Sequence, residues 1–589
     1  MRKVVRIALV ALAACAPAAP LSINKSLPAP PTSVPDAAAP PPAPDPFPDD
    51  AEIAKATEAY LDLFVDVHPE AATALGLHRR DGELDDRSIA GHDQATAREQ
   101  EMLESLERRF ASPRASVAAK TDLALLLGAL RVDVRVRRVD RPLQRRPQVY
   151  VEPLDAVFQL VARDFAPAPE RAKDVVARLE KVPKTIALAK DNLLNPPKVW
   201  TEIAIEKASG AKAFLEQQRP FLSAALPGDA RADSALKAAL AAYEDYARYL
   251  RSDVMKSSNG RFAAGRELYE YLLANDAFLE EDADAVLAIG KRVFAETNDR
   301  MTELAKKIDP GAPGWPAVTA KIKGKHPTAD DLVATYQKEV KRARDFLVAN
   351  AAVPFPPDDD LSVIETPAFM RATLTAAYDA PPAFDDRSSK GFFFVTPIDK
   401  NDSPARQEAM LRENDYADIV DTVVHEAYPG HHLQLSFARR SPSRARRVFD
   451  HAIMSEGWAL YAEELMAELG YYDDEQRLIQ LQWALVRAAR VVIDVGLHVG
   501  GMTFEQAVKV LTDEVHLERP LAISEARRYT EDPTQPSAYI VGREKILELR
   551  RRAREQGGAS FSLERFHGDL LARGTIPPSL AAREMFPAP

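Results

Sequence analysis

The sequence has a single cysteine, Cys15, in 589 residues, so no disulfide bond can form within the chain. It has no repeat of fixed period, which argues against a solenoid of stacked repeats. Long hydrophobic runs are also missing, since the apolar stretch from Ile7 to Ala14 is too short to span a bilayer. Segments with the residue pattern of strands are few, whereas helix-forming residues dominate. These features together predict a mainly α protein.

Positive charge is in deficit, because 77 Lys and Arg residues stand against 88 Asp and Glu residues and the formal net charge is −11. This balance argues against nucleic acid as a partner. The hydrophobic share of 46% and the charged share of 28% are those of an ordinary globular protein. A chain of this length exceeds the size at which one hydrophobic core stops growing, so we expect two or more lobes.

The first residues have the pattern of a secretory signal peptide, with a basic start followed by a short apolar run that ends at Ala14. A series of small residues closing on Cys15 resembles a bacterial lipobox, which predicts cleavage of residues 1–14 and diacylation of the Cys15 thiol. An ordinary signal peptide with a chance cysteine is the alternative. Residues 15–50 are rich in Pro, Ala and acidic residues and predict an extended tether. We therefore expect an exported protein, lipid-anchored to a bacterial membrane and facing the periplasm or the cell exterior.

Apolar residues recur at helical spacing from Ala51 onward. Helices are predicted, between Pro, Gly or Asp/Asn signals, at about 95–111, 116–136, 151–164, 168–192, 199–218, 231–253 and 260–275. Two later segments, Val363 to Pro367 and Gly391 to Pro397, predict strands of a small sheet. Such a sheet would form a cleft edge to which an extended peptide could add as a strand, or else a purely structural hairpin.

One stretch concentrates the side chains of a catalytic metal site: His425-Glu426-Ala427-Tyr428-Pro429-Gly430-His431-His432. In the helical motif His-Glu-x-x-His, ligands four residues apart share a face, and the glutamate between them handles protons. Here His431 follows His425 by six residues, about 240° of helical rotation, whereas His432 returns to the same face but rises about 10 Å. A two-residue bulge at Pro429-Gly430 would bring His431 to the ligand position. We favour His431 as the second ligand, with His432 as the alternative.

A third ligand is available in Ser455-Glu456-Gly457-Trp458, because Glu456 follows His431 by 25 residues, enough for a turn and an antiparallel helix. A His-His-Glu site would leave a position open for water. Glu463 lies two turns beyond Glu456 and could orient a ligand, but a solvated helix face is the favoured interpretation for Glu463 and Glu464. His498 and Tyr539 are candidate donors to an oxyanion, with a structural role as the alternative for each.

Together with Pro69 to His78, Arg528-Tyr529 and Tyr539 to Arg543, these motifs resemble the bacterial family known as domain of unknown function 885, over nearly the whole chain from about residue 51. That family is similar, more distantly, to helical zinc peptidases such as carboxypeptidase Taq, angiotensin-converting enzyme and thimet oligopeptidase. The resemblance implies that His425, the histidine after Gly430 and Glu456 are zinc ligands, Glu426 is the general base and Tyr539 is the oxyanion donor. This sequence has two more residues before Gly430 than the peptidase motif has. The second histidine ligand could therefore be either His431 or His432.

The expected protein has an N-terminal helical lobe at 51–275 and a catalytic lobe at 276–589, with a deep cleft between them and a small sheet beside the metal site. The expected function is zinc-dependent hydrolysis of short peptides with one zinc ion and Glu426 as general base. Two alternatives remain: a zinc amidase or esterase acting on another substrate class, and a non-catalytic surface lipoprotein that binds peptides.

Overall fold

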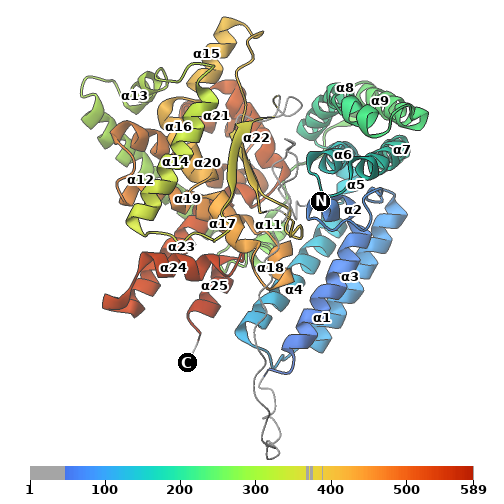
Figure 1. The fold of residues 1–589 in the computed structure, drawn as a ribbon, viewed down its shortest axis with the longest axis horizontal. Helices are drawn as coiled ribbons and strands as arrows, with labels where there is room; N and C mark the ends of the chain where they lie inside the picture. The colour runs from blue at the N-terminus through green and yellow to red at the C-terminus, as the bar shows by residue number, and fades with distance from the viewer. Residues whose placement is uncertain (1–46, 367–370, 372–375, 388, 588–589) are drawn as a thin grey trace, which may run out of the picture.

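The structure is a computed structural model that describes residues 47–366, 371, 376–387 and 389–587. The predicted signal peptide, Cys15 and the tether up to residue 46 lie outside the described residues. The described chain is mainly helical with one small sheet, as predicted (Figure 1). No helix in the described ranges combines the length and apolarity needed to cross a membrane.

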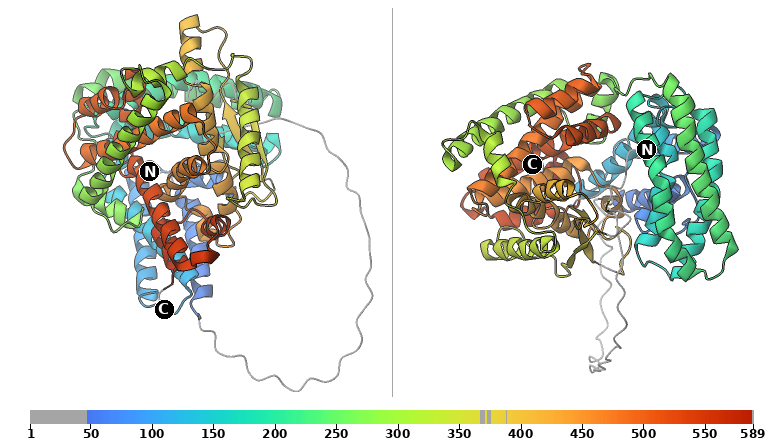
Figure 2. Two further views of the ribbon diagram at one scale, coloured as in Figure 1. Left: turned by 90° about the vertical axis from the view of Figure 1, so that its left-hand side faces the viewer. Right: turned by 90° about the horizontal axis from the view of Figure 1, so that it is seen from above.

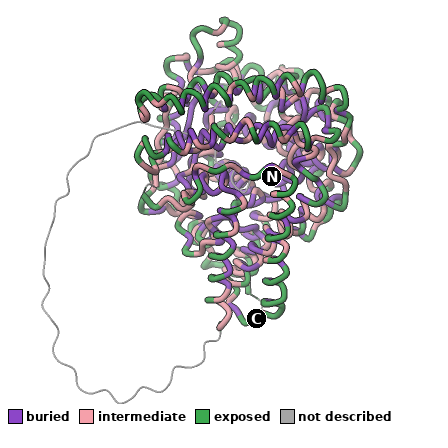
Figure 3. The backbone as a smooth tube through the Cα atoms, turned by 90° about the vertical axis from the view of Figure 1, so that its right-hand side faces the viewer, coloured by how far each residue is buried: buried purple, intermediate pink, exposed green. Residues whose placement is uncertain are grey.

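The helices up to residue 257 form two groups (Figure 1). Three long helices, α1, α3 and α4, lie side by side, and α7, α8 and α9 pack together beyond them. Figure 3 shows α7 to α9 with an exposed outer side and a buried inner side, as expected for amphipathic helices. Their bounds are α1 (Asp50–Val67), α2 (Pro69–Ala74), α3 (Ile89–Arg109), α4 (Val117–Val139), α5 (Pro142–Arg145), α6 (Pro153–Ala162), α7 (Ala168–Asn192), α8 (Lys198–Ala225), α9 (Ala230–Tyr249) and α10 (Met255–Ser257).

The helices from residue 266 onward gather around α16, α19, α20 and α23, which carry the candidate site. Seen from above, this part lies beside the α7 to α9 group (Figure 2). The bounds are α11 (Arg266–Asn275), α12 (Ala283–Ile308), α13 (Trp315–Ile322), α14 (Leu332–Asn350), α15 (Pro404–Arg412), α16 (Tyr416–Glu426), α17 (His431–Ala438), α18 (Arg444–Val448), α19 (Ala452–Glu468), α20 (Asp474–His498), α21 (Phe504–Asp513), α22 (Arg519–Glu531), α23 (Gln535–Gly557), α24 (Leu563–Leu571) and α25 (Pro578–Met585).

The largest hydrophobic cluster joins both ends of the chain, because buried residues of α1 and α4 pack with residues of α14, α16 and α19. The buried members of a second cluster all lie within residues 143–254. The α7 to α9 group therefore has a core of its own, whereas α1, α3 and α4 share one with the C-terminal part. The predicted division between residues 275 and 276 stays a prediction.

The sheet has three strands in the order β1–β3–β2, with bounds β1 (Leu361–Glu365), β2 (Ala376–Asp379) and β3 (Gly391–Val395). Both predicted strand segments are confirmed, but they form a parallel pair instead of a hairpin. The third strand, β2, was not predicted. It runs antiparallel to β3, whose Phe393 and Phe394 are fully buried. Because β2 is only four residues long, it has too few residues to show a strand period.

Candidate metal centre

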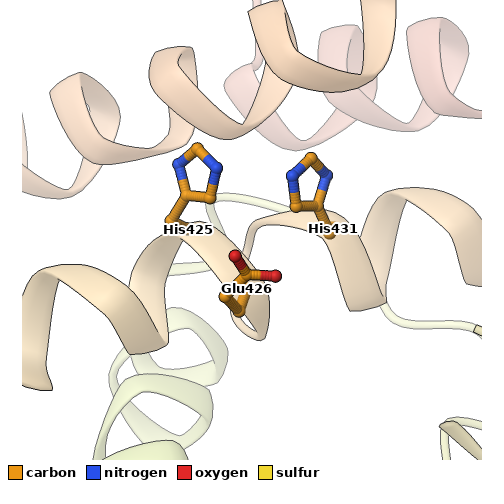
Figure 4. Close-up of side chains that lie close together, drawn as sticks. All are labelled: His425, Glu426 and His431. Atoms are coloured by element: carbon orange, nitrogen blue, oxygen red, sulfur yellow. The ribbon is translucent and has the colours of Figure 1, made fainter. Parts of the chain in front are cut away.

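The motif stretch forms two helices instead of one, because α16 ends at Glu426 and α17 begins at His431 (Figure 4). The expected two-residue bulge is thus a complete break. Trp458 of α19 donates its indole N–H to the Pro429 carbonyl over 2.7 Å, which satisfies a carbonyl exposed by the break. At Gly430 the backbone folds back so closely that a Cβ atom would lie 1.8 Å from the His425 carbonyl oxygen. Only glycine fits this turn.

We expect Gly430→Ala to destabilise the protein by about 3 kcal/mol or more, because the added methyl group would overlap rigid backbone. Gly210→Ala in α8 is the matched control, since a Cβ atom there meets nothing within 4 Å. Alanine in that helix interior should be neutral or stabilise by up to about 1 kcal/mol. Denaturant unfolding measures both changes, and equal stability of the two variants would contradict the predicted close approach.

The break places two imidazoles together. The ring centroids of His425 and His431 are 4.9 Å apart with the planes nearly perpendicular, and Figure 4 shows both rings on the same side of the break. Glu456 of α19 completes the group, with its Oε2 atom 3.4 Å from His431 Nε2 and 3.9 Å from His425 Nε2. Ligand atoms of a tetrahedral zinc site, each about 2.0–2.1 Å from the ion, are roughly 3.3 Å apart. The spacing of the three side chains therefore fits a small metal ion.

Glu463 determines which nitrogen of His425 faces this group. Its carboxylate accepts the Nδ1–H of His425 over 2.8 Å, which leaves the lone pair of Nε2 directed toward Glu456. Burial alone would raise the pKa of Glu463, but the charge of Arg487 and the hydrogen bond with His425 hold it below the usual value. The favoured interpretation of Glu463 as a solvated residue is wrong, since its side chain is 0% exposed. Because Glu463 follows Glu456 by two helical turns, helix periodicity alone places both on one face.

Electrostatics also favours a cation at this position. Burial lowers the pKa of His431, but the hydrogen bond with Glu456 and the charge of Glu426 raise it to about 9. The carboxylates that raise this pKa would also stabilise a metal cation bound by His431. The set of two imidazoles and a carboxylate, with a further carboxylate holding one imidazole, matches the chemistry of zinc ligands and their supporting residues.

Glu426 lies at the last position of α16, between the two histidines in Figure 4. One ligand atom from each of His425, Glu426 and His431 lies within 4.8 Å of the others. The backbone N–H of Tyr378 in β2 donates to Glu426 Oε2 over 3.1 Å and holds the carboxylate in place. This is a contact that sequence reasoning missed, because β2 itself was missed.

His432 points away from the candidate centre. It is fully buried, its Nε2 atom lies 2.8 Å from Asp359, and its Nδ1 atom lies 3.2 Å from the Tyr378 hydroxyl. Asp359 also accepts hydrogen bonds from Tyr428 and Arg344. The side chain therefore connects α17 to the loop before β1 and to β2. Of the two histidines left open by the sequence, the structure brings His431 to the group and not His432.

The two candidate oxyanion donors differ in position. Tyr539 lines the cleft, and its ring lies 6.5 Å from the His425 ring. The guanidinium of Arg490 lies over the Tyr539 ring, 4.8 Å from its centroid. His498 is 1% exposed, with its ring nitrogens facing the Tyr529 carbonyl at 2.9 Å and the Ala264 N–H at 3.3 Å. The structure therefore does not bring His498 to the centre, whereas the role of Tyr539 stays a prediction.

A second group of possible ligands, His68, Glu99 and Asp133, lies at the α1–α2 junction and on α3 and α4. There the guanidinium of Arg137 lies 2.9 Å from His68 Nε2 and 2.8 Å from Glu99. A guanidinium already pairs with two of these three residues, so a metal ion would have to displace it. The centre at His425 and His431 is thus the better candidate of the two.

The candidate centre opens into a cleft with a volume of about 310 Å³. Its walls come from segments far apart in the sequence: α4, the end of α11, strand β2, the α16–α17 break, the start of α19 and the start of α23. Such a volume is in the range of small-molecule or short-peptide sites.

Comparison with known proteins agrees with the sequence motifs. Residues 69–585 match the model of a family described as "Bacterial protein of unknown function (DUF885)". A solved structure from Shewanella oneidensis, described as a candidate lipoprotein of unknown function, is 26% identical with a TM-score of 0.78, over 90% of this chain and 99% of that one. Another, described as a candidate lipoprotein from Colwellia psychrerythraea, is 19% identical with a TM-score of 0.75, over 91% of this chain and 98% of that one. A search of curated proteins finds no match. The chain belongs to the bacterial DUF885 family.

Proposed function

We propose that this protein is a zinc-dependent metallopeptidase that hydrolyses peptide bonds of short peptides. The observation that carries the proposal is the convergence of His425, His431 and Glu456 on one point, with the carboxylate of Glu426 beside them in a cleft. Two imidazoles and one carboxylate leave a coordination position open, which is the arrangement of catalytic zinc sites rather than structural ones.

A zinc ion held by these three residues supplies Lewis acidity, which polarises a carbonyl group and lowers the pKa of water. The chain itself supplies the proton transfers. Glu426 takes the proton from the attacking water and passes it to the leaving amine. Its hydrogen bond from the Tyr378 N–H fixes one carboxylate oxygen and leaves the other to accept the proton. Tyr539, whose ring lies 6.5 Å from the His425 ring, donates its hydroxyl hydrogen to the developing oxyanion.

The position of β2 supports an extended substrate. This strand is at the edge of the sheet, and Ala377, Tyr378 and Ala380 line the cleft. A peptide lying along this side of the cleft would pass Glu426, whose carboxylate the Tyr378 N–H already holds, and could bond to the remaining main-chain groups of the edge. The limited cleft volume favours short peptides over folded proteins.

The test combines metal analysis with hydrolysis of a peptide library by the purified protein. We expect about one zinc ion per chain, loss of peptide hydrolysis on treatment with a chelator, and recovery on addition of zinc. A protein without stoichiometric metal that cannot be loaded with zinc contradicts the proposal. Esters and non-peptide amides in the same panel identify the other hydrolase activities, and peptide binding without turnover identifies a binding protein.

We expect Glu463→Gln to weaken zinc affinity about 10- to 100-fold, because glutamine loses the charge that holds the His425 imidazole. Competition with a zinc chelator measures the change. The neighbouring Glu464 pairs with Arg300 and Arg477 instead, so Glu464→Gln is the matched control and should bind zinc like the wild type. Equal affinities of the two variants would exclude Glu463 as an orienting residue.

For location, we propose export and lipid anchoring at Cys15. The N-terminal signal pattern supports this, and so do the descriptions of the two similar structures as candidate lipoproteins. The tether after Cys15 would then hold the cleft away from the membrane surface.

A further inference from the structure

Acidic side chains dominate the lining of the cleft. Among the described residues, no lysine or arginine lines it, whereas six carboxylates do: Asp133, Asp276, Glu426, Asp450, Glu456 and Asp532. A dication at the metal centre would offset only two of these charges. A narrow cleft lined by one sign of charge focuses the potential and concentrates ligands of opposite charge. The free carboxylate of a peptide would be repelled here, and an ammonium group attracted.

Asp450 is the carboxylate next to the metal centre that has no part in the proposed catalysis. It directly precedes the N-terminal cap of α19, and its carboxylate interacts electrostatically with both His431 and Glu456. Although its neighbours are buried, Asp450 itself is exposed and lines the cleft. A ligand group bound to Asp450 would therefore lie directly beside the reacting bond.

His451, the next residue, adds a hydrogen-bond acceptor. Its Nδ1 atom lies 2.8 Å from the Asp276 carbonyl, which can only accept, so Nδ1 carries the hydrogen and Nε2 a lone pair. Burial lowers the pKa of His451, which keeps the ring neutral. The side chain is more than nine-tenths buried in the cleft wall, and Nε2 has no hydrogen-bond partner among the described residues. An unpaired buried acceptor is costly and calls for a donor from a ligand.

Gln535 of α23, which lies beside Glu456, adds a second acceptor. Its amide nitrogen faces Glu456 Oε1 at 3.4 Å, and because a carboxylate accepts, this end is the NH₂ group. The oxygen Oε1 is therefore the free end, and it has no hydrogen-bond partner among the described residues. Gln535 is also more than nine-tenths buried. Asp450, His451 and Gln535 all line the cleft and thus offer a carboxylate and two free acceptors, while the N–H donors of His451 and Gln535 are already paired.

We propose that this acceptor pocket, defined as Asp450, His451 and Gln535, binds a primary ammonium group of the substrate beside the metal centre. An ammonium group has three donors and no acceptor, which matches a carboxylate and two neutral acceptors. The group comes either from the free N-terminus of a peptide or from a lysine side chain. This inference rests on the proposed peptidase function and names the substrate group that is recognised, a primary ammonium group and not a carboxylate.

The test measures binding by calorimetry to full-length Glu426→Gln protein loaded with zinc, with the peptide checked to be intact afterwards. The probes are tetra-alanine with free ends, the N-acetylated form, the C-terminally amidated form, and an N-acetylated form with one lysine. We expect acetylation of the N-terminus to weaken binding about 10- to 100-fold, because it removes a charge-assisted contact. Amidation of the C-terminus should not weaken binding. Restored affinity in the lysine peptide would identify a side chain as the source, and continued weak binding the N-terminus.

Two variants locate the effect. Asp450→Asn should bring the free and acetylated peptides to within about 3-fold of each other, whereas Asp299→Asn, an exposed aspartate of α12 outside the cleft, should keep the full difference. Equal binding of free and acetylated tetra-alanine, greater loss on amidation than on acetylation, or no binding of any probe would each overturn the ammonium pocket. Failure of the peptidase proposal would appear separately, as a wild-type protein without metal and without hydrolysis.

Discussion

Replacing Glu426 by glutamine is expected to slow peptide hydrolysis by roughly 100- to 10,000-fold, because glutamine cannot accept a proton from water. The amide is nearly isosteric with the carboxylate and still accepts the hydrogen bond from the Tyr378 N–H. The loss should therefore appear in kcat, with KM little changed. Steady-state kinetics on one peptide, together with zinc analysis of the same preparation, measures both parts of the expectation.

The control for this experiment is Glu468→Gln on α19, whose side chain faces solvent and pairs with Arg550. Its activity should stay within about 2-fold of wild type, as expected for an exposed ion pair. Wild-type rates in Glu426→Gln would remove Glu426 from the mechanism. Loss of zinc in that variant would instead make Glu426 a ligand, a role that its closeness to His425 and His431 allows geometrically.

The neighbours His431 and His432 should respond in opposite ways to substitution by alanine. We expect His431→Ala to weaken zinc binding by roughly 100- to 1,000-fold, because one of three protein ligands is lost. Since His431 is near the cleft and partly exposed, its replacement should leave the fold intact. Zinc content after dialysis against a weak chelator distinguishes this variant from the wild type.

His432→Ala should keep zinc at wild-type stoichiometry and lose stability instead. The buried imidazole holds Asp359 and the Tyr378 hydroxyl, and its removal leaves a buried carboxylate short of one partner and a cavity. A loss of about 3 kcal/mol in the free energy of unfolding is expected. Denaturant unfolding of the metal-free proteins measures it. If His432→Ala loses zinc and His431→Ala does not, the assignment of the ligand is reversed.

Local patterns in the sequence were sufficient for most helices and for the composition of the centre. Apolar spacing and Pro or Gly signals predicted 168–192, which matches α7 (Ala168–Asn192), and 116–136, which matches α4 (Val117–Val139) to within three residues. The motif residues His425, Glu426 and Glu456 were likewise recognisable, because metal chemistry needs those residue types at helical intervals. Such signals lie within a few helical turns of chain, where steric and hydrogen-bonding rules act.

Contacts between distant segments settled what those patterns left open. The choice of His431 over His432 depends on two distant contacts of the His432 ring. One is with Asp359, 73 residues away, and the other is with Tyr378 of β2, 54 residues away. Glu463 is buried because α16 and α20 pack over its side of α19. A polar residue on a helix is solvated only where no other element covers it, and the sequence pattern does not show which side is covered. The acceptor pocket likewise joins α19 to α23. Side chains of this kind take their role from the neighbours that folding brings to them, and helical periodicity carries no information about those neighbours.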